Sequence, residues 1–195
     1  MKLRDNNLNT SVYWNETYDS EIEKGIERIA LERFEKVAKL LPHNAQVLDV
    51  GCGTGDLIRY LEIKRPDCVY TGIDFSDIAI EHCKQLSPVG TFIVGDIRTL
   101  NVLTAEYDVV ISFETIEHFE DIKTFVKTLC SLTKPDGDVI ITCPFKNMVD
   151  SEEHLHSLNY VDIITLFDED KTDIVEVSRY SENFKNLFCH IKIKE

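Results

Sequence analysis

Residues 47–56 read VLDVGCGTGD, an apolar run that stops at three glycines in alternate positions. The run has the length and composition of a buried strand, and the residues that follow Asp56 have the spacing of a helix. Glycine lets the backbone turn sharply and approach a ligand without a side-chain collision. Gly51, Gly53 and Gly55 do not follow the G-x-G-x-x-G pattern of dinucleotide-binding loops. The stretch therefore predicts a strand, a loop that can lie against a ligand, and a helix.

On both sides of this unit, runs of strand period alternate with runs of helical period. A long helix is expected to begin at Asp19 or Ser20 and to end at Pro42, because the apolar residues in between keep to one face. Further helices are expected from the glycine loop to about residue 63 and at residues 76–86, 121–133 and 159–167. Strands are expected at residues 45–50, 68–74, 90–96, 107–113, 138–144, 172–180 and 186–194.

Helices separate the first five of these strands, which predicts a parallel sheet with helices on both faces. Residues 187–193 alternate between apolar and more polar side chains, as expected of an antiparallel edge strand. The chain of 195 residues is expected to form a single domain. In sheets of this kind, ligands bind at the carboxyl ends of the strands.

The composition narrows the choice of partners. The net charge of −14 repels phosphate backbones, so we expect no nucleic-acid partner. No apolar run approaches the length of a membrane span, and the first residues lack the apolar segment of a secretion signal, so we expect a cytoplasmic protein with no membrane segment. The six cysteines are widely spaced and form no CxxC pair, which predicts free thiols, several of them in the core.

Two acidic residues are expected beside the glycine loop, because Asp74 ends the second strand and Asp96 the third. A carboxylate at Asp74 can accept hydrogen bonds from both hydroxyls of a ribose, and Asp96 lies within reach of an adenine amino group. Phe75 and Ile97 directly follow the acids and can sandwich the adenine ring. Either acid alone is equally a helix cap or a turn residue. The whole set, at successive strand ends, indicates a nucleoside-binding edge.

These motifs resemble the class I S-adenosylmethionine-dependent methyltransferases over residues 45–145, and more loosely beyond. VLDVGCGTGDL, TGIDFS and VGDIR resemble the family's first three motifs, and DVVISFETIEHFED resembles the segment after its fourth strand. LTKPDGDVIITCP resembles its LKPGG turn and fifth strand, with Asp136 in place of the commoner glycine. The resemblance implies an α/β, Rossmann-like fold with a seven-stranded, mostly parallel sheet. Within the domain (1–195), residues 1–44 would form a helical cap, residues 45–145 the cofactor-binding core, and residues 146–195 an acceptor-side loop, helix and terminal strands.

The resemblance further implies S-adenosylmethionine as cofactor. The glycine loop would line its methionine part, Asp49 would hold its amino group through the loop, and Phe113 would offer a backbone carbonyl near the sulfonium. The segment SVYWNETYDS (11–20) resembles family aromatics that precede the first helix and fold over the cofactor, so Trp14 with Tyr13 or Tyr18 would cover the site; equally, they would anchor the terminus to the sheet. The expected cofactor-binding residues are Asp49, Gly51, Cys52, Gly53, Asp74, Phe75, Asp96, Ile97, Phe113, Glu114, Trp14 and Tyr13.

Residues 113–119, FETIEHF, follow the fourth expected strand and contain the candidate catalytic groups. Transfer of a methyl group to a hydroxyl calls for a base, and an imidazole with a pKa of ~6.5 suits that role at neutral pH. We expect His118 to be the base, with Glu117 and His154 as the other catalytic residues. The alternative for His118 is a structural histidine that bonds loop carbonyls. His154 and His156 lie in a polar loop that is expected to be exposed.

The same segment also admits a metal site. Glu114, Glu117 and His118, with His154 or His156, resemble the metal site of the small-RNA terminal 2′-O-methyltransferases and the glutamate–histidine cluster of ubiquinone-pathway O-methyltransferases. Such ligands suit Mg²⁺ or Mn²⁺. Against this, E-x-I-E-H also occurs in family members with no known metal, and CPFKNM departs from the small-RNA enzymes' TPN stretch. We expect a bare base and no metal.

The expected activity is O-methylation of a small molecule such as a sugar or a nucleotide-linked sugar. The stretch EHLHSLNYVDIITLF resembles the HxRxFT segment of methyltransferases in polysaccharide and natural-product pathways, which favours a glycosyl acceptor. Metal-dependent RNA 2′-O-methylation is one alternative. The other is a non-catalytic, cofactor-binding subunit that activates a partner.

Overall fold

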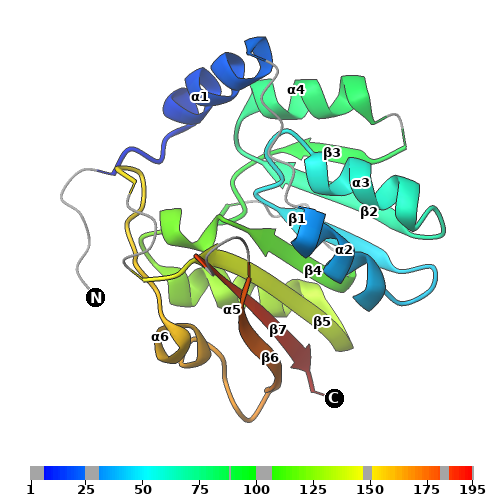
Figure 1. Cartoon of the computed structure of the whole chain (residues 1–195), viewed down its shortest axis with the longest axis vertical. Coiled ribbons are helices and arrows are strands. Elements are labelled where there is room, and N and C mark those ends of the chain that lie inside the picture. The colour runs from blue at the N-terminus through cyan, green and yellow to red at the C-terminus, as the bar shows by residue number, and fades with distance from the viewer. Residues whose placement is uncertain are drawn as a thin grey trace.

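The computed structural model describes residues 7–24, 31–87, 89–99, 107–146, 151–180 and 185–194. Within these ranges the chain forms a seven-stranded sheet with helices on both faces (Figure 1). The strands follow the order β3-β2-β1-β4-β5-β7-β6, and β7 runs antiparallel to both of its neighbours while the other pairs run parallel. The predicted α/β fold, with a mostly parallel sheet and an antiparallel last strand, is confirmed.

The elements have the following bounds. The strands are β1 Gln46–Val50, β2 Val69–Asp74, β3 Thr91–Val94, β4 Tyr107–Phe113, β5 Thr133–Pro144, β6 Thr172–Tyr180 and β7 Asn186–Ile193. The helices are α1 Ser11–Glu23, α2 Leu31–Leu40, α3 Asp56–Lys64, α4 Asp77–Leu86, the 3₁₀ turn η1 Ile116–His118, α5 Ile122–Leu132 and α6 Tyr160–Ile164.

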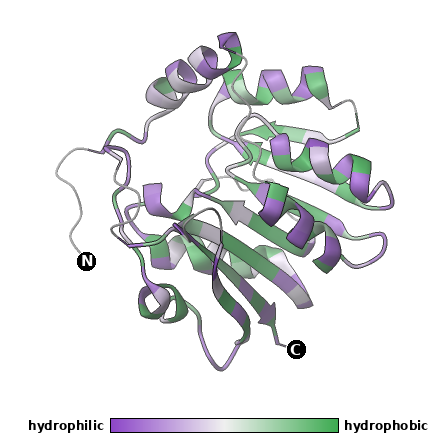
Figure 2. Cartoon of the chain, viewed as in Figure 1, coloured by the Kyte–Doolittle hydropathy of each residue, from purple (hydrophilic) through white to green (hydrophobic). Residues whose placement is uncertain are grey.

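Apolar side chains fill the space on each side of the sheet. Helices α2, α3 and α4 pack against one face through Phe34, Leu61 and Ile80. Helix α5 packs against the other face through Phe125 and Leu129. Burying a side chain of this size stabilises the fold by about 2 kcal/mol. Figure 2 shows the strands coloured mainly as hydrophobic, whereas the helices also carry hydrophilic stretches. Each helix therefore packs its apolar side against the sheet.

The predicted free cysteines are confirmed. All six cysteines are free, and five of them are buried. In the part of the chain that the structure describes, no helix combines the length and apolar character needed to cross a membrane.

The first helix differs from its prediction. Helix α1 begins at Ser11, because the Thr10 side chain accepts a hydrogen bond from the Tyr13 N–H and caps it. Asp19 and Ser20 therefore lie inside a helix rather than at its start. Helix α1 ends at Glu23 and α2 begins at Leu31, while residues 25–30 of the single predicted helix lie outside the described residues. The aromatic segment predicted to precede the helix forms its first turns.

Other boundaries shift by a few residues. Strand β5 begins at Thr133 rather than at residue 138, because Thr133 already pairs with Tyr107 before an irregular stretch that contains Asp136 in a left-handed conformation. Strand β3 is shorter than predicted, and α6 ends at Ile164 rather than at residue 167.

The sheet register brings polar residues together at one edge. Asp49 pairs with Gly72 on β2 and with Ile111 on β4, and Asp74 pairs with Val94 on β3. The parallel strands β1 to β4 thus end on the same side of the sheet, where the glycine loop turns into α3. The candidate site lies at this edge.

Candidate functional site

A large cavity opens at the carboxyl ends of β1 to β4. It contains about 1150 Å³ of empty space when its open mouth is counted. The glycine loop, side chains from α1 and α2, and the turn after β4 all line it. Residues 1–44 thus contribute to the cavity together with the predicted core, and the division of the chain into three functional segments stays a prediction.

The glycine loop needs glycine for two reasons. Gly51 and Gly53 have φ angles of +75° and +51°, a region that other residues adopt only with strain. A Cβ atom at Gly51 would lie 2.5 Å from Thr115 Oγ1, and one at Gly53 would lie 3.0 Å from the Tyr18 hydroxyl. Cys52 also lines the cavity, and hydrogen bonding with Cys83 and burial raise the pKa of its thiol well above the usual value. The backbone of the loop, rather than its side chains, therefore forms the surface at Gly51 and Gly53.

Asp74 holds this loop in place. Its carboxylate accepts hydrogen bonds from the backbone N–H of Gly53 and that of Ser76, each at 2.9 Å. The side chain lines the cavity while the residue is only 4% exposed. Ser76 in turn caps α4 by accepting a hydrogen bond from the Ala79 N–H. Asp74 therefore positions the loop, and its contact with a ligand stays a prediction.

Asp49 is a buried carboxyl group at the bottom of the cavity. Burial and the nearby Asp74 raise its pKa to about 7, while Arg33 acts in the opposite direction. A carboxyl with a raised pKa gains most from a cationic ligand, because the ligand stabilises its charged form. This environment suits the amino group that the sequence assigned to Asp49.

Arg33 is a cavity residue that the sequence reasoning missed. It projects from α2, where its Nη1 donates hydrogen bonds to Glu114 Oε1 at 3.1 Å and to the Tyr180 hydroxyl at 2.7 Å. Its guanidinium lies 5.0 Å from the centre of the Phe113 ring. The only local signal was a basic residue next to the buried Phe34, and a surface arginine gives the same signal.

Glu114 lines the cavity, but protein groups already engage its carboxylate. Besides the bond from Arg33, it accepts a hydrogen bond from the Tyr180 hydroxyl at 2.8 Å and one from Asn186 Nδ2 at 2.6 Å. Its backbone has a φ of +47°, in the left-handed region. Glu114 therefore positions Arg33. Because these three hydrogen bonds engage both of its oxygens, Glu114 is not expected to bind a metal together with Glu117 and His118.

The predicted adenine-binding residues Phe75, Asp96 and Ile97 all line the cavity. The Asp96 carboxylate is paired with the Arg98 guanidinium, which lowers the pKa of Asp96. Phe113 also lines the cavity, and its backbone carbonyl accepts a hydrogen bond from Thr115 Oγ1 at 2.8 Å. The contacts of these residues with a cofactor stay predictions.

Helix α1 covers the cavity with Trp14 and Tyr18, which are 6% and 7% exposed. Tyr13 is not among the described residues that line the cavity, and its contact with a cofactor stays a prediction. Residues four apart share a helix face, so Trp14 and Tyr18 point the same way, whereas Tyr13 is rotated by roughly 100° from Trp14. Tyr13 instead packs edge-on against Trp14, with ring centres 5.5 Å apart.

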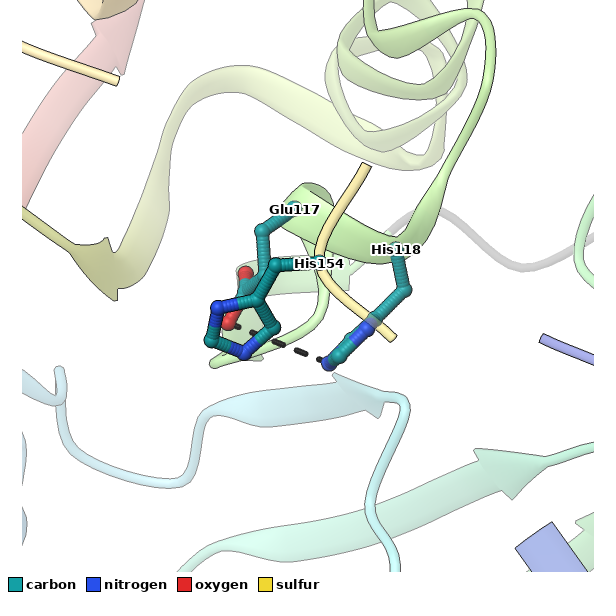
Figure 3. Close-up of side chains that lie close together, drawn as sticks. All are labelled: Glu117, His118 and His154. Carbon is teal, nitrogen blue, oxygen red and sulfur yellow. Dashed lines mark ion pairs between the residues drawn. The ribbon is translucent and has the colours of Figure 1, made fainter. Parts of the chain in front are cut away.

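The candidate catalytic residues Glu117, His118 and His154 converge on one point, as Figure 3 shows. His118 Nε2 lies 3.9 Å from Glu117 Oε1, and the two imidazole rings lie 5.1 Å apart. Their potential ligand atoms all lie within 4.8 Å of one another. Of the three, His118 is among the residues that line the cavity. The structure therefore assembles the predicted set from η1 and from the loop after β5.

Glu117 is the unusual member of this cluster. It is 1% exposed, and neither carboxylate oxygen has a hydrogen-bond partner among the residues that the structure describes. Burial and the nearby Glu114 raise its pKa well above the usual value. A buried carboxylate without hydrogen bonds is costly unless it is protonated or meets a cation. One carboxylate and two imidazoles form a donor set that can hold a divalent ion.

His156 has a different role from His154. It is 4% exposed rather than exposed as predicted, because its loop folds back so that Glu117's carbonyl accepts hydrogen bonds from the N–H groups of Leu155 and His156. Its Nε2 lies 3.2 Å from the Glu120 carbonyl, which places the ring in a structural contact.

Comparisons with known proteins agree with this geometry. Residues 14–173 match the family described as "Methyltransferase domain". A malonyl-[acyl-carrier protein] O-methyltransferase from Priestia megaterium is 34% identical over 98 residues, which cover 49% of this chain and 35% of that protein. A ubiquinone biosynthesis O-methyltransferase from Coxiella burnetii is 30% identical over 105 residues, which cover 52% of this chain and 44% of that protein. The chain thus spans less than half the length of these curated relatives.

Among solved structures, the plantazolicin methyltransferase in complex with a pentazolic desmethylPZN analog and SAH superposes with a TM-score of 0.76. The alignment covers 95% of each chain at 16% identity, which supports the fold. The family match extends over most of the chain and includes the glycine loop, Asp74, Asp96 and the cluster after β4. The chain belongs to the class I S-adenosylmethionine-dependent methyltransferases.

Proposed function

We propose that this protein transfers a methyl group from S-adenosylmethionine to a hydroxyl group of a small polar acceptor, with a sugar or nucleotide-linked sugar as the first candidate class. The observation that carries the proposal is the position of His118, which stands at the edge of the cofactor cavity with one ring nitrogen held by a backbone carbonyl. The names of the relatives give different acceptors, so the proposed acceptor class rests on the resemblance of residues 153–167 to the HxRxFT segment of methyltransferases in polysaccharide and natural-product pathways.

The residues present fit the cofactor. Asp74 would accept the ribose hydroxyls, and Asp49 would pair with the amino group. Arg33, held by Glu114 and Tyr180, would pair with the carboxylate of the same amino acid part. Phe75 and Ile97 would flank the adenine ring. When bound, S-adenosylmethionine supplies a methyl group on an electrophilic sulfonium, and the chain's main contribution is to position the reactants.

His118 would remove the acceptor's proton. Its Nδ1 lies 3.2 Å from the Glu153 carbonyl, and a carbonyl only accepts hydrogen bonds, so Nδ1 carries the proton. In the neutral ring Nε2 then presents its lone pair, as a general base requires. The Trp14 ring packs edge-on against the imidazole with ring centres 5.0 Å apart, which restricts its rotation.

His118→Gln is expected to lower kcat about 100-fold, because it removes the base but keeps a side chain of similar length. The dissociation constant of S-adenosylhomocysteine should stay within about twofold. Transfer of a radiolabelled methyl group to a panel of sugars, nucleotide-linked sugars and phenols measures the first effect, and calorimetry the second. His43→Gln changes a histidine with a 94% exposed side chain and serves as control. Turnover that His118→Gln leaves unchanged would contradict the assignment.

A second candidate is metal-dependent O-methylation, which the buried Glu117 carboxylate favours because it has no hydrogen-bond partner among the described residues. In this case Glu117, His118 and His154 would hold a divalent ion that lowers the pKa of the acceptor hydroxyl. Because two of the three donors are imidazole nitrogens, Mn²⁺ or another transition ion suits the site better than Mg²⁺.

If this second candidate is correct, Mn²⁺ should bind one site per chain, and Glu117→Gln should weaken that binding about 100-fold because it removes the anionic ligand. Electron paramagnetic resonance of free Mn²⁺ measures the binding without any acceptor. Glu152→Gln, in an exposed residue of the same loop, serves as control. Equal Mn²⁺ binding by both variants would leave the bare base as the mechanism. Single-stranded RNA in the turnover panel tests RNA 2′-O-methylation, which the net charge of −14 disfavours.

A further inference from the structure

The segment before α1 is tied to the loop that carries His154. Asn9 Nδ2 donates a hydrogen bond to the Glu153 carbonyl at 2.8 Å, and Asn9 Oδ1 accepts one from Trp14 Nε1 at 3.2 Å. Asn9 is partly buried and lines the cavity. Its amide therefore joins the helix that covers the cofactor cavity to the loop on the acceptor side.

The Glu153 carbonyl is a shared acceptor. It receives Asn9 Nδ2 at 2.8 Å and lies 3.2 Å from His118 Nδ1, and a carbonyl oxygen has two lone pairs for two such donors. Trp14, the other partner of Asn9, packs against the His118 ring at 5.0 Å. Asn9 thus contacts both groups that hold the His118 imidazole. These are the Glu153 carbonyl, which lies beside its Nδ1, and the Trp14 ring, which packs against it.

We propose that Asn9 is a positioning residue for His118. It holds the Glu153 carbonyl and the Trp14 ring where they fix the His118 ring in the form with the proton on Nδ1 and the lone pair on Nε2. The hydrogen bond made by one ring nitrogen of a histidine decides which nitrogen is protonated. The inference rests on the proposed function only in giving His118 a chemical role, because the protonation state of the ring can be measured without an acceptor.

The same helix also reaches the cofactor side. Tyr18 places its hydroxyl beside Gly53, and Asn15 donates a hydrogen bond to Asp77 and accepts one from Ser76 Oγ at 2.6 Å. The base and the cofactor loop are therefore contacted by one element.

The Asn9 contact can be removed without unfolding the loop. The loop has its own anchors, because the N–H groups of Leu155 and His156 donate to the Glu117 carbonyl at 2.8 and 3.2 Å. Asn9→Asp keeps the shape of the side chain and the oxygen that accepts from Trp14, and it removes the N–H donor to Glu153. Asn15→Ala is the matched control, since it cuts the other anchor of the same helix without touching the chain of contacts to His118.

Nitrogen-15 NMR of the imidazole rings, assigned to His118 by comparison with His118→Gln, tests the proposal. In the wild type and in Asn15→Ala we expect one ring form, protonated on Nδ1. In Asn9→Asp we expect a mixture of ring forms and a drop in kcat of about tenfold, with the KM for S-adenosylmethionine within about twofold. Asn9→Ala should show the same pattern.

A His118 ring that stays in one form in both Asn9 variants would overturn the proposal, and so would an Asn15→Ala variant that changes the ring form as much as they do. A failure of the proposed function has a different signature. In that case the ring forms behave as described, but His118→Gln leaves turnover unchanged.

Discussion

Asp49→Asn is expected to make the cofactor-free protein more stable while it weakens S-adenosylmethionine binding about 1000-fold, because breaking a buried ion pair costs about 3–5 kcal/mol. The two effects have one cause. The Asp49 carboxyl is buried near Asp74, which raises its pKa to about 7. In the cofactor-free protein its charge is destabilising, and in the proposed complex the same charge would pair with the ligand's amino group.

The sign of the stability effect follows from linkage. An unfolded chain loses the Asp49 proton near pH ~4, whereas the folded protein keeps it up to about pH 7. The contribution of this group to stability is therefore present at low pH and is lost as the pH rises from about 4 to about 7. Above pH 7 the neutral asparagine avoids this loss, which is at most about 4 kcal/mol for a pKa that rises from about 4 to about 7. Each kcal/mol gained raises the melting temperature by roughly 2–4 °C in a domain of this size.

Cofactor affinity should depend on pH for the same reason. Below the pKa of about 7, wild-type affinity for S-adenosylhomocysteine should fall by up to tenfold per pH unit, because the carboxyl must lose its proton to pair with the amino group. Asp49→Asn should show a flat profile. Thermal melts at pH 5 and 8 and calorimetry over the same range measure both effects. Asp19→Asn, an exposed residue on α1, is the control for the change in charge. A variant that is less stable at pH 8, or that binds as the wild type does, would contradict this account of Asp49.

Asp74→Asn is also expected to weaken cofactor binding about 1000-fold, because a carboxylate that accepts two ribose hydroxyls makes two charge-assisted hydrogen bonds of about 1.5–3 kcal/mol each. The amide also presents N–H groups where the carboxylate now accepts hydrogen bonds from Gly53 and Ser76, so the loop loses its fixed shape. Asp77→Asn changes an exposed residue on the same turn and should leave the affinity within about twofold.

Two ligands separate the two aspartates. S-adenosylhomocysteine contains the adenosine and the amino acid part, whereas 5′-methylthioadenosine keeps the adenine and ribose but lacks the amino acid part. Asp74→Asn should weaken the binding of both ligands by similar factors. Asp49→Asn should weaken the binding of S-adenosylhomocysteine far more than that of 5′-methylthioadenosine. Equal losses for both ligands in Asp49→Asn would show that Asp49 acts through the shape of the loop rather than on the amino group.

The parts of the site that lie at strand ends were predictable from the sequence. The glycine loop, Asp74 and Asp96 are each fixed by a strand that ends and a turn that follows, and parallel strands bring such ends to one edge. Local pattern and topology are then enough to place them.

The groups that depend on distant partners were not predictable. Arg33 enters the cavity because Glu114 and Tyr180 bind it, and Tyr180 comes from β6 far along the chain. The choice between Tyr13 and Tyr18 depended on where α1 begins, and the Thr10 cap was missed. Glu117 was predicted from the motif at residues 113–119, but its burial was not. That burial arises from the fold of the loop after β5. Tertiary packing, rather than local pattern, decides each of these.

The most direct test of the account is a calorimetric titration of S-adenosylhomocysteine into the wild-type protein and into Asp74→Asn at pH 8. We expect one binding site per wild-type chain and an affinity about 1000-fold lower in Asp74→Asn, since both charge-assisted hydrogen bonds are lost. Absence of binding to the wild type, or binding that Asp74→Asn leaves unchanged, would contradict the assignment of this cavity to the cofactor.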